Sequence, residues 1–381
     1  MLPQAHPAPE PVYFARVSAG LEQLAWGDIE RHTGARLLGL GHRRVDFACA
    51  AAPAGLLALR AVDDVYVRVA RLRGLDHTRA SLGRLTRKLG EVDFDPALAL
   101  IAQVRTLPEY PMYRVTASHL GRRNYSRYDI EGAVEQALTL RLPWRFVLNA
   151  ADEPMPDLDL RVLLEADWAL LGLRLGAAPL HRRDYKVAER PGALKPPVAY
   201  CLALLAGCAP GQVLLDPACG AGTILAEALA LVPGGTVIGG DTDVDALMLA
   251  QMNLAALGAP APIIEATTTR APDAETAGSW LYQGDARAIP LAAGAIDTLV
   301  CNLPWGRQAP AGHDIAALYC DILREAARVL RPGGRAVLLT DRHAELRAAL
   351  AAATGLQPAA ELPISLFGSH PAIYLAERLP A

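Results

Sequence analysis

Residues 213–231 constrain the fold of this chain more than any other segment. An apolar strand pattern ends at Asp216, two glycines follow at Gly220 and Gly222, and a helical pattern begins directly after them. Glycine adopts positive φ angles and lets a ligand lie against the turn and the N-terminus of the next helix. The segment therefore predicts a strand, a glycine turn and a helix at the ligand-binding edge of an α/β sheet.

The spacing of the next acidic residue supports this interpretation. A second strand pattern, residues 236–240, leads into Asp241, which lies 25 residues after Asp216. Doubly wound sheets place an acid at about this position to bind ribose hydroxyls. We therefore predict a mostly parallel sheet that binds a ribose at Asp241.

The turn does not match the pyrophosphate-binding form of this motif. Dinucleotide-binding enzymes use Gly-x-Gly-x-x-Gly, whereas here the third spaced glycine is absent and Asp216 precedes the turn. A nucleoside cofactor without phosphate groups fits better. Asp285 follows Gly284 in a loop and is placed to accept a hydrogen bond from an adenine amine; the alternative is a turn or helix-cap aspartate.

A second motif, residues 302–306, follows the apolar strand pattern 296–301. The side-chain oxygen of Asn302 and the carbonyl of Leu303 can both accept hydrogen bonds from an exocyclic amine, and so stabilise the positive charge that grows during its attack. Pro304 bends the chain beside them, and Trp305 can stack on the face of a base. The alternative is a strand that ends in a turn with a core tryptophan.

Together these motifs resemble the class I S-adenosylmethionine-dependent methyltransferases over about half of the chain. The resemblance implies that the methionine moiety lies at the glycine turn, the ribose at Asp241 and the adenine at Asp285. The cofactor-binding residues that it implies are Asp216, Cys219, Gly220, Gly222, Thr223, Asp241, Asp285, Ala286, Asn302 and Leu194.

Residues 302–306 are similar to the Asn/Asp-x-Pro-aromatic signature of amino-methylating enzymes, and the leucine in place of the first proline resembles the guanine-N2 methyltransferases. The catalytic residues that this likeness implies are Asn302, Leu303, Pro304 and Trp305. Asp314 and His313 stand close by, but they begin a helical pattern and are interpreted as a cap rather than as a catalytic base.

Length and composition favour an intracellular protein of several domains. A chain of 381 residues exceeds what one hydrophobic core usually supports, so we expect two to three domains. The apolar runs are too short to cross a bilayer, and residues 1–10 lack the basic flank and apolar core of a signal peptide, so we expect a cytoplasmic protein. The six cysteines have neither Cys-x-x-Cys spacing nor a histidine at ligand spacing. We expect a monomer with no bound metal and no disulfide.

The charge distribution points to a nucleic-acid partner for the first half of the chain. Residues 1–190 hold 26 Lys and Arg against 23 Asp and Glu, whereas residues 191–381 hold 11 against 17. Basic residues concentrate at 68–88 and 114–127, and such clusters fit contacts with RNA phosphates. The candidate RNA-binding residues are Arg84, Arg87, Lys88, Arg122 and Arg123. The alternative is a solvated helix face.

Residues 1–182 contain two successive α/β patterns. The first has strand patterns at 12–17, 44–48 and 64–70 and helical patterns at 21–33 and 54–59, as in a ferredoxin-like unit. The second has helical patterns at 80–89, 96–107 and 130–140 and strand patterns at 112–118, 145–149, 158–165 and 168–173.

This order, with the basic segment 113–123 and the motif at residues 180–185, resembles the ferredoxin-like and THUMP pair of RNA-modifying enzymes. The resemblance implies a ferredoxin-like domain at 1–75, a THUMP domain at 76–182 and a methyltransferase domain at 183–381. It also implies that the acceptor stem of tRNA is the partner.

The remaining patterns complete the second half. Residues 190–197 resemble the segment that covers the methionine end of the cofactor in this family, and a proline-rich linker that opens a helix at 198–206 is the alternative. We expect a mostly parallel seven-stranded sheet that ends in an antiparallel pair, 363–368 with 372–376. Residues 259–280 are predicted to be a long loop beside the adenine.

Three functions remain open on the sequence alone. The first is methylation of the N2 amine of a guanosine in tRNA, at position 6 of the acceptor stem. The second is guanine-N2 methylation of ribosomal RNA or amino methylation of adenine. The third is an RNA-binding protein without catalytic activity.

Overall fold

A computed structural model of the chain describes residues 10–148, 155–264, 277–304, 314–366 and 368–380. The chain forms two compact units. The first comprises Met1–Val17 and Ala25–Leu180, and the second comprises Ser18–Leu24 and His181–Ala381. Among the described residues, no helix has the length and apolar character needed to cross a membrane.

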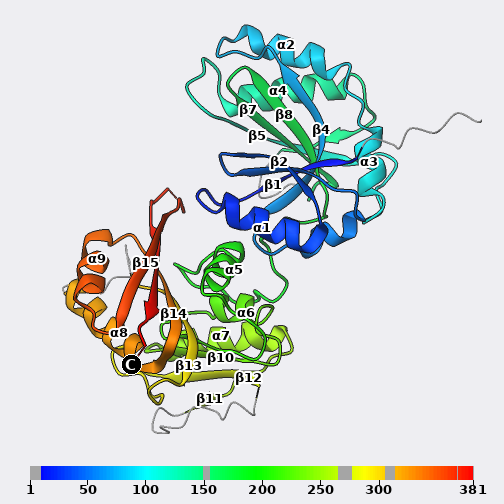
Figure 1. The fold of residues 1–381 in the computed structure, drawn as a ribbon. Coiled ribbons are helices and arrows are strands. Elements are labelled where there is room, and N and C mark those ends of the chain that lie inside the picture. Colours follow the sequence, from blue (N-terminus) through cyan, green and yellow to red (C-terminus); the bar gives the residue numbers. More distant parts are fainter. Residues whose placement is uncertain (1–9, 149–154, 265–276, 305–313, 367, 381) are drawn as a thin grey trace, which may run out of the picture. The chain divides into compact units, whose positions relative to one another are not determined.

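The first unit is built on one mixed sheet, whose strand order in the described part of the chain is β2-β3-β1-β4-β8-β7-β5-β6. The strands are β1 (Val12–Arg16), β2 (Arg36–Gly41), β3 (Arg44–Ala48), β4 (Asp64–Arg73), β5 (Met112–His119), β6 (Arg145–Phe146), β7 (Leu158–Glu165) and β8 (Trp168–Arg174). The helices are α1 (Glu22–Thr33), the 3-10 helix η1 (Pro53–Ala58), α2 (Ala80–Leu89), α3 (Asp95–Ile101) and α4 (Arg127–Thr139). Helices α2 and α4 lie side by side over the part of the sheet that holds β5 and β7 (Figure 1).

Most element positions predicted for this unit are confirmed, and the differences have local causes. Helix α4 begins three residues earlier than the predicted 130, because Ser126 caps it and exchanges hydrogen bonds with Asp129. The predicted strand 145–149 is wrong beyond its first two residues, Arg145–Phe146, and residue 149 lies outside the described ranges. Strand β2 was not predicted; it is an edge strand with exposed leucines and two glycines, so its apolar alternation is broken.

The sheet of the first unit runs without a break through both predicted N-terminal domains. Strand β4 pairs antiparallel with β8, in a register that runs from Tyr66↔Arg174 to Arg73↔Trp168. Asp64 on β4 is nearly fully buried and accepts a hydrogen bond of 2.6 Å from Arg174 on β8. The boundary at 75/76 therefore falls within a continuous sheet, and the domain limits stay predictions.

The second unit holds a mostly parallel sheet with strand order β11-β12-β10-β9-β13-β14-β16-β15 in its described residues. Its strands are β9 (Val213–Asp216), β10 (Thr236–Asp241), β11 (Ile263–Ile264), β12 (Gly278–Gln283), β13 (Ile296–Asn302), β14 (Leu330–Thr340), β15 (Leu356–Pro363) and β16 (Ala372–Arg378). Its helices are α5 (Pro196–Leu205), α6 (Thr223–Ala228), α7 (Val244–Ala256), α8 (Ile315–Val329) and α9 (His343–Ala352). Helices α5, α6 and α7 cover one face of the sheet, and α8 and α9 cover the other (Figure 1).

The predicted fold class is confirmed for this unit, with three corrections. The terminal antiparallel pair is Leu356–Pro363 with Ala372–Arg378, so the prediction that 363–368 forms its first strand is wrong. The predicted loop 259–280 is interrupted by β11 and by the start of β12, while residues 265–276 lie outside the described part of the chain. The two-residue β11 adds an eighth, edge position to the seven strands expected.

A short early segment of the chain, Ser18–Leu24, belongs to this second unit. Ala19 forms an antiparallel bridge with Ser365, whose N–H donates to the Ala19 carbonyl at 3.0 Å. Gly20 has a φ of +93°, and a Cβ atom at this position would lie 2.4 Å from the Pro363 carbonyl oxygen. Only glycine fits here, and it lets the two segments pack directly against each other.

The topology brings three predicted site residues to one edge of the sheet. Strands β10, β9 and β13 are parallel neighbours. Asp241, Asp216 and Asn302 are the last residues of these three strands. Ligands of open α/β sheets bind outside the carboxyl ends of the strands, so the site is expected at this edge.

Candidate active site

A cavity of about 580 Å³ opens at the carboxyl edge of the second sheet. Its volume lies within the range of small-molecule sites. The predicted residues that line it are Leu194, Asp216, Cys219, Gly220, Thr223, Asp241, Asp285, Ala286, Asn302 and Pro304. Gly222 and Leu303 are not in its lining, and Trp305 lies outside the described residues. Most of the predicted cofactor site is therefore brought together in one place.

The glycine turn adopts the conformation expected of it. Gly220 and Gly222 have φ angles of +54° and +73°, in the left-handed region that favours glycine. A Cβ atom on Gly222 would lie 3.0 Å from the Ala250 Cβ, so this glycine also lets α7 pack closely on the turn. A Cβ on Gly220 would meet nothing closer than 3.8 Å, at Arg190, so here glycine serves the backbone conformation.

Asp241 ties the turn to the neighbouring strand. One carboxylate oxygen accepts the Gly220 N–H at 2.9 Å, and the other accepts the Asp243 N–H at 3.0 Å. Each carboxylate oxygen has a second lone pair, so Asp241 can accept further hydrogen bonds from a ribose diol in the cavity. Its backbone partners fix its orientation before any ligand arrives.

Asp216 is buried at the end of β9, and burial raises its pKa to about 8. One of its oxygens accepts the Ala218 N–H at 3.2 Å. Burial also raises the pKa of the Cys219 and Cys301 thiols well above the usual value, so both stay protonated. The floor of the cavity thus holds a carboxyl group that is largely neutral at pH 7.

Asp285 is held by a neighbour. The Arg287 guanidinium donates to both of its carboxylate oxygens, at 2.6 to 3.0 Å, and the hydrogen bonds lower the pKa of Asp285. The side chain is therefore ionised and oriented, with lone pairs remaining for a further donor. This arrangement fits the predicted contact with an amine. It also fits the alternative of a turn aspartate, because the Arg287 backbone N–H donates to the same carboxylate.

The charge of the lining fits a phosphate-free, cationic cofactor. Beside the largely neutral Asp216, four aspartates and two arginines line the cavity: Asp241, Asp285, Asp314, Asp321, Arg190 and Arg287. Both arginines are already paired, Arg190 with Asp243 at 3.1 Å and Arg287 with Asp285. A pyrophosphate would meet this acidic wall unfavourably, whereas a sulfonium nucleoside would not.

The segment before α5 is a strap attached to the cavity wall, and we define it as residues 183–194. Its first attachment is Glu227 on α6, a fully buried carboxylate that accepts hydrogen bonds from Arg183 at 3.0 Å and Tyr185 at 2.9 Å. Farther along, the Lys186 ammonium donates to the Leu194 carbonyl at 3.4 Å. The end of the strap, 190–194, lines the cavity.

The second attachment is Asn253 on α7, which is also fully buried. Its side chain accepts the Ala188 N–H at 3.0 Å and donates to the Ala188 carbonyl at 2.9 Å. It also donates to the Ala221 carbonyl of the glycine turn at 2.9 Å. One side chain therefore joins the strap to the turn that forms the floor of the site. Sequence reasoning missed both Glu227 and Asn253.

The predicted catalytic motif follows β13 directly. Asn302 is half-buried and lines the cavity, while the Leu303 side chain points into the core and its N–H donates to the Leu339 carbonyl at 3.1 Å. The Pro304 carbonyl accepts a hydrogen bond of 2.8 Å from the hydroxyl of Tyr319. The backbone after the strand is thus held on two sides.

Helix α8 supplies a wall of the cavity that the sequence did not assign. Asp314 caps the helix, accepting the N–H groups of Ala316 and Ala317 at 3.0 and 3.2 Å, as expected of a cap. The lining residues of this helix are Ala317, Leu318, Asp321 and Ile322. Their spacing of three to four residues after a motif loop is the signal that could have predicted them.

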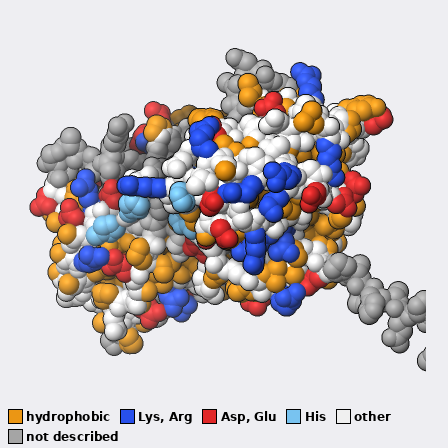
Figure 2. Space-filling model, turned by 90° about the horizontal axis from the view of Figure 1, so that it is seen from above, with side chains coloured by type: hydrophobic (Ala, Val, Ile, Leu, Met, Phe, Trp, Pro, Cys, Tyr) orange, Lys and Arg blue, Asp and Glu red, His pale blue; other side chains and the backbone are white. Residues whose placement is uncertain are grey.

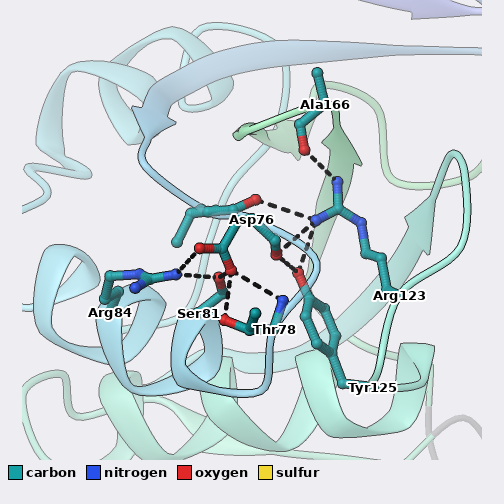
Figure 3. Close-up of polar contacts among 8 residues, drawn as sticks. Asp76, Thr78, Ser81, Arg84, Arg123, Tyr125 and Ala166 are labelled. Carbon is teal, nitrogen blue, oxygen red and sulfur yellow. Dashed lines mark hydrogen bonds and ion pairs between the residues drawn. The ribbon is translucent and has the colours of Figure 1, made fainter.

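Two of the predicted RNA-binding arginines are engaged within the first unit (Figure 3). The Arg123 guanidinium donates to the carbonyls of Leu75, Asp76 and Ala166 at 2.9 to 3.1 Å and to the Tyr125 hydroxyl at 2.8 Å. Arg84 forms an ion pair of 2.7 Å with Asp76. Arg123 thus joins segments that are distant in the sequence, whereas Arg84 ties the start of α2 to the turn just before it.

The other three candidates are placed differently. Arg122 and Arg87 are exposed and Lys88 is half-exposed, and none of them forms an ion pair with a residue that the structure describes. Arg122 lines a shallow hollow with His77, Gly121 and Asp167. Figure 2 shows that Lys and Arg side chains gather on the face of the first unit seen from above. Within the described part of the chain, these three side chains therefore have no acidic partner.

The fold and the cavity define a class I methyltransferase, with a Rossmann-like sheet and a cavity at the glycine turn. Comparison with protein families agrees, because residues 183–361 match the model described as RMKL-like, methyltransferase domain.

Similar proteins place the chain more closely. It is 33% identical over 270 residues to the tRNA (guanine(6)-N2)-methyltransferase of Thermus thermophilus, covering 70% of this chain and 72% of that protein. It is 29% identical to the tRNA (guanine(6)-N(2))-methyltransferase THUMP3 of Bos taurus, covering 72% of this chain and 52% of the relative. The crystal structure of TrmN from Thermus thermophilus is 28% identical and aligns over 97% of this chain and 100% of that one, with a TM-score of 0.76. The chain belongs to the family of S-adenosylmethionine-dependent tRNA guanine-N2 methyltransferases.

Proposed function

We propose that this protein transfers a methyl group from S-adenosylmethionine to the exocyclic N2 amine of a guanosine in tRNA, at position 6 of the acceptor stem. The observation that carries the proposal is the position of Asn302, at the end of β13 and in the lining of a cavity that also contains Asp216, Gly220 and Asp241. The nucleobase and the RNA class follow the names of the relatives.

The residues of this chain have distinct roles in the proposal. Asp241 holds the ribose, Asp285 and Ala286 hold the adenine, and the turn with Cys219, Gly220, Gly222 and Thr223 holds the methionine moiety under the strap residue Leu194. S-adenosylmethionine supplies an electrophilic methyl carbon when bound. The Asn302 side-chain oxygen and the Leu303 carbonyl accept the hydrogens of the guanine amine and stabilise the charge that grows on it during attack.

Pro304 sets the direction of the chain after these two acceptors, and Trp305, outside the described residues, is proposed to stack on the base. Alignment and proximity then account for the transfer without a covalent enzyme intermediate. Within the described residues, no group of three or more His, Cys, Asp and Glu side chains could hold a metal ion.

For RNA binding we propose the exposed basic residues of the first unit, Arg87, Lys88 and Arg122. Arg84 and Arg123 support them by holding the segments from which they project. The proposed domains remain 1–75, 76–182 and 183–381, the first two sharing one sheet.

The test is incubation of the purified protein with methyl-labelled S-adenosylmethionine and separate pools of unmodified tRNA and ribosomal RNA, followed by digestion and nucleoside chromatography. The expected product is N2-methylguanosine in tRNA, which mapping should locate at position 6. Label in ribosomal RNA or as methyladenosine would overturn the substrate, and RNA binding without any label would favour the non-catalytic alternative. Asn302→Ala serves as the control for transfer by this site.

A further inference from the structure

A buried tyrosine behind the catalytic motif forms a chain of hydrogen bonds with no role assigned so far. Tyr319 lies on α8 and its side chain has no solvent exposure. Its hydroxyl oxygen is 2.8 Å from the Pro304 carbonyl oxygen and 2.8 Å from the Thr340 hydroxyl oxygen. Thr340, the last residue of β14, is also fully buried.

The chemistry of the partners fixes the direction of every bond in this chain. A carbonyl oxygen can only accept, so the Tyr319 hydroxyl must donate its single proton to Pro304. The Thr340 hydroxyl must then donate to the Tyr319 oxygen, and it accepts in turn from the Arg342 N–H at 3.0 Å. Burial raises the pKa of Tyr319 to about 12, so the donor keeps its proton at neutral pH.

These hydrogen bonds hold the peptide segment that carries the proposed acceptor carbonyl. The Leu303 N–H is held by the Leu339 carbonyl on β14 at 3.1 Å, and the Pro304 carbonyl is held from the opposite element, α8. The Leu303 carbonyl lies between these two anchors in the chain. Two fixed points on either side of a peptide group restrict its rotation, which sets where its oxygen points.

We propose that Tyr319, supported by Thr340, is a positioning residue that orients the Leu303 carbonyl toward the amine of the target base. This inference rests on the proposed function, because it assigns a purpose to the carbonyl that the proposal uses as an acceptor. Tyr319 is not among the residues that line the cavity, so in this proposal it acts through the Leu303–Pro304 backbone. The ring of Tyr319 also belongs to the hydrophobic core of the unit, so the hydroxyl alone is the feature to test.

The test compares Tyr319→Phe with Tyr374→Phe. Both changes remove one buried tyrosine hydroxyl and keep the ring; the Tyr374 hydroxyl bonds to His343 and Glu361, away from the motif. For Tyr319→Phe we expect kcat to fall roughly 10- to 100-fold, because the carbonyl that accepts from the amine is no longer held in place, while cofactor Kd and RNA KM stay within about twofold. For Tyr374→Phe we expect a lower Tm with unchanged kcat.

The supporting residue gives a second arm. Thr340→Val removes the donor to Tyr319 but leaves Tyr319 bonded to Pro304, so it should lower kcat less than Tyr319→Phe. Thr340→Ser keeps a hydroxyl and should restore kcat to near the wild-type value. A kcat for Tyr319→Phe equal to that of the wild type, or a loss no larger than in Tyr374→Phe, would overturn the proposal.

Hydrogen–deuterium exchange separates this inference from the proposed function. Peptides covering residues 299–304 should exchange faster in Tyr319→Phe than in the wild type or in Tyr374→Phe, with no substrate present. If the wild-type enzyme methylates a different nucleoside, the substrate assignment fails, while the kcat and exchange comparisons still decide the role of Tyr319. Unchanged exchange would refute the anchoring whatever the substrate.

Discussion

Asn253→Ala is expected to damage both the stability of the second unit and its cofactor site. The change deletes three hydrogen bonds of 2.9 to 3.0 Å, to the N–H and carbonyl of Ala188 and to the carbonyl of Ala221. Because the asparagine is fully buried, these backbone groups are left without their partner inside the protein. An unsatisfied buried polar group costs about 1–3 kcal/mol, so we expect a loss of about 3–5 kcal/mol in the free energy of unfolding.

The same change should weaken cofactor binding for a separate reason. Ala221 belongs to the turn that lines the cavity, and Ala188 lies in the strap that ends at the cavity wall. Without Asn253 these two segments are no longer joined, and the site must be ordered when the ligand binds. We expect cofactor Kd to rise about tenfold, equivalent to about 1.4 kcal/mol.

Gln251→Ala is the matched control on the same helix. Among the described residues, Gln251 makes one side-chain hydrogen bond, to the Ala261 carbonyl at 2.9 Å, and neither residue lines the cavity. We expect it to cost about 1 kcal/mol of unfolding free energy and to leave cofactor Kd unchanged. Urea unfolding and isothermal titration calorimetry measure the two quantities. A cofactor Kd for Asn253→Ala equal to that of Gln251→Ala would refute the coupling between strap and turn.

Three further outcomes are expected. Asn302→Ala should lower transfer about 100-fold with cofactor affinity nearly intact, and Asp241→Ala should mainly weaken cofactor binding; full activity of Asn302→Ala in steady-state assays would contradict its assigned role. Arg122→Glu should weaken RNA binding and reduce the salt dependence of that binding in filter-binding titrations. Arg123→Glu should chiefly lower Tm, because the guanidinium of Arg123 is bound to backbone carbonyls. Burial raises the pKa of Asp216 to about 8, so the stability that its proton provides is present at low pH and is lost as the pH rises through 8. The free energy of unfolding of the wild type should therefore fall from pH 5 to pH 9 relative to that of Asp216→Asn. Parallel pH curves of the two proteins in urea titrations would exclude this linkage.

The parts of the site that the sequence predicted share one property. Asp216, Asp241 and Asn302 each end an apolar strand pattern, and parallel neighbouring strands bring such ends to one edge. The local pattern therefore predicted both the strand and the position of the functional side chain at its end. The terminal strand was misplaced to 363–368 because β15 is mostly exposed on the edge of the sheet and lacks a clear apolar alternation.

The missed residues have partners that no local pattern reveals. Asn253 and Tyr319 donate hydrogen bonds to backbone carbonyls. Every residue has such a carbonyl, so the sequence does not indicate which one accepts the hydrogen bond. Arg123 illustrates the opposite case. A basic cluster predicts phosphate contacts, but the guanidinium of Arg123 is occupied by carbonyls of the protein itself, as Figure 3 shows. Only a three-dimensional arrangement separates a free cation from an internal one.

The bridge between Ala19 and Ser365 has a consequence for biosynthesis. The ribosome makes the segment Ser18–Leu24 before any strand of the second sheet, yet its partner Ser365 emerges only after nearly all of those strands. Domains that are continuous in sequence can fold as they leave the ribosome, whereas this one must wait for its last strands before the early segment finds its place. Completion of the methyltransferase unit is thus expected only after the segment that follows β15 has been made, and a nascent chain stalled before residue 363 should leave the early segment unprotected from protease.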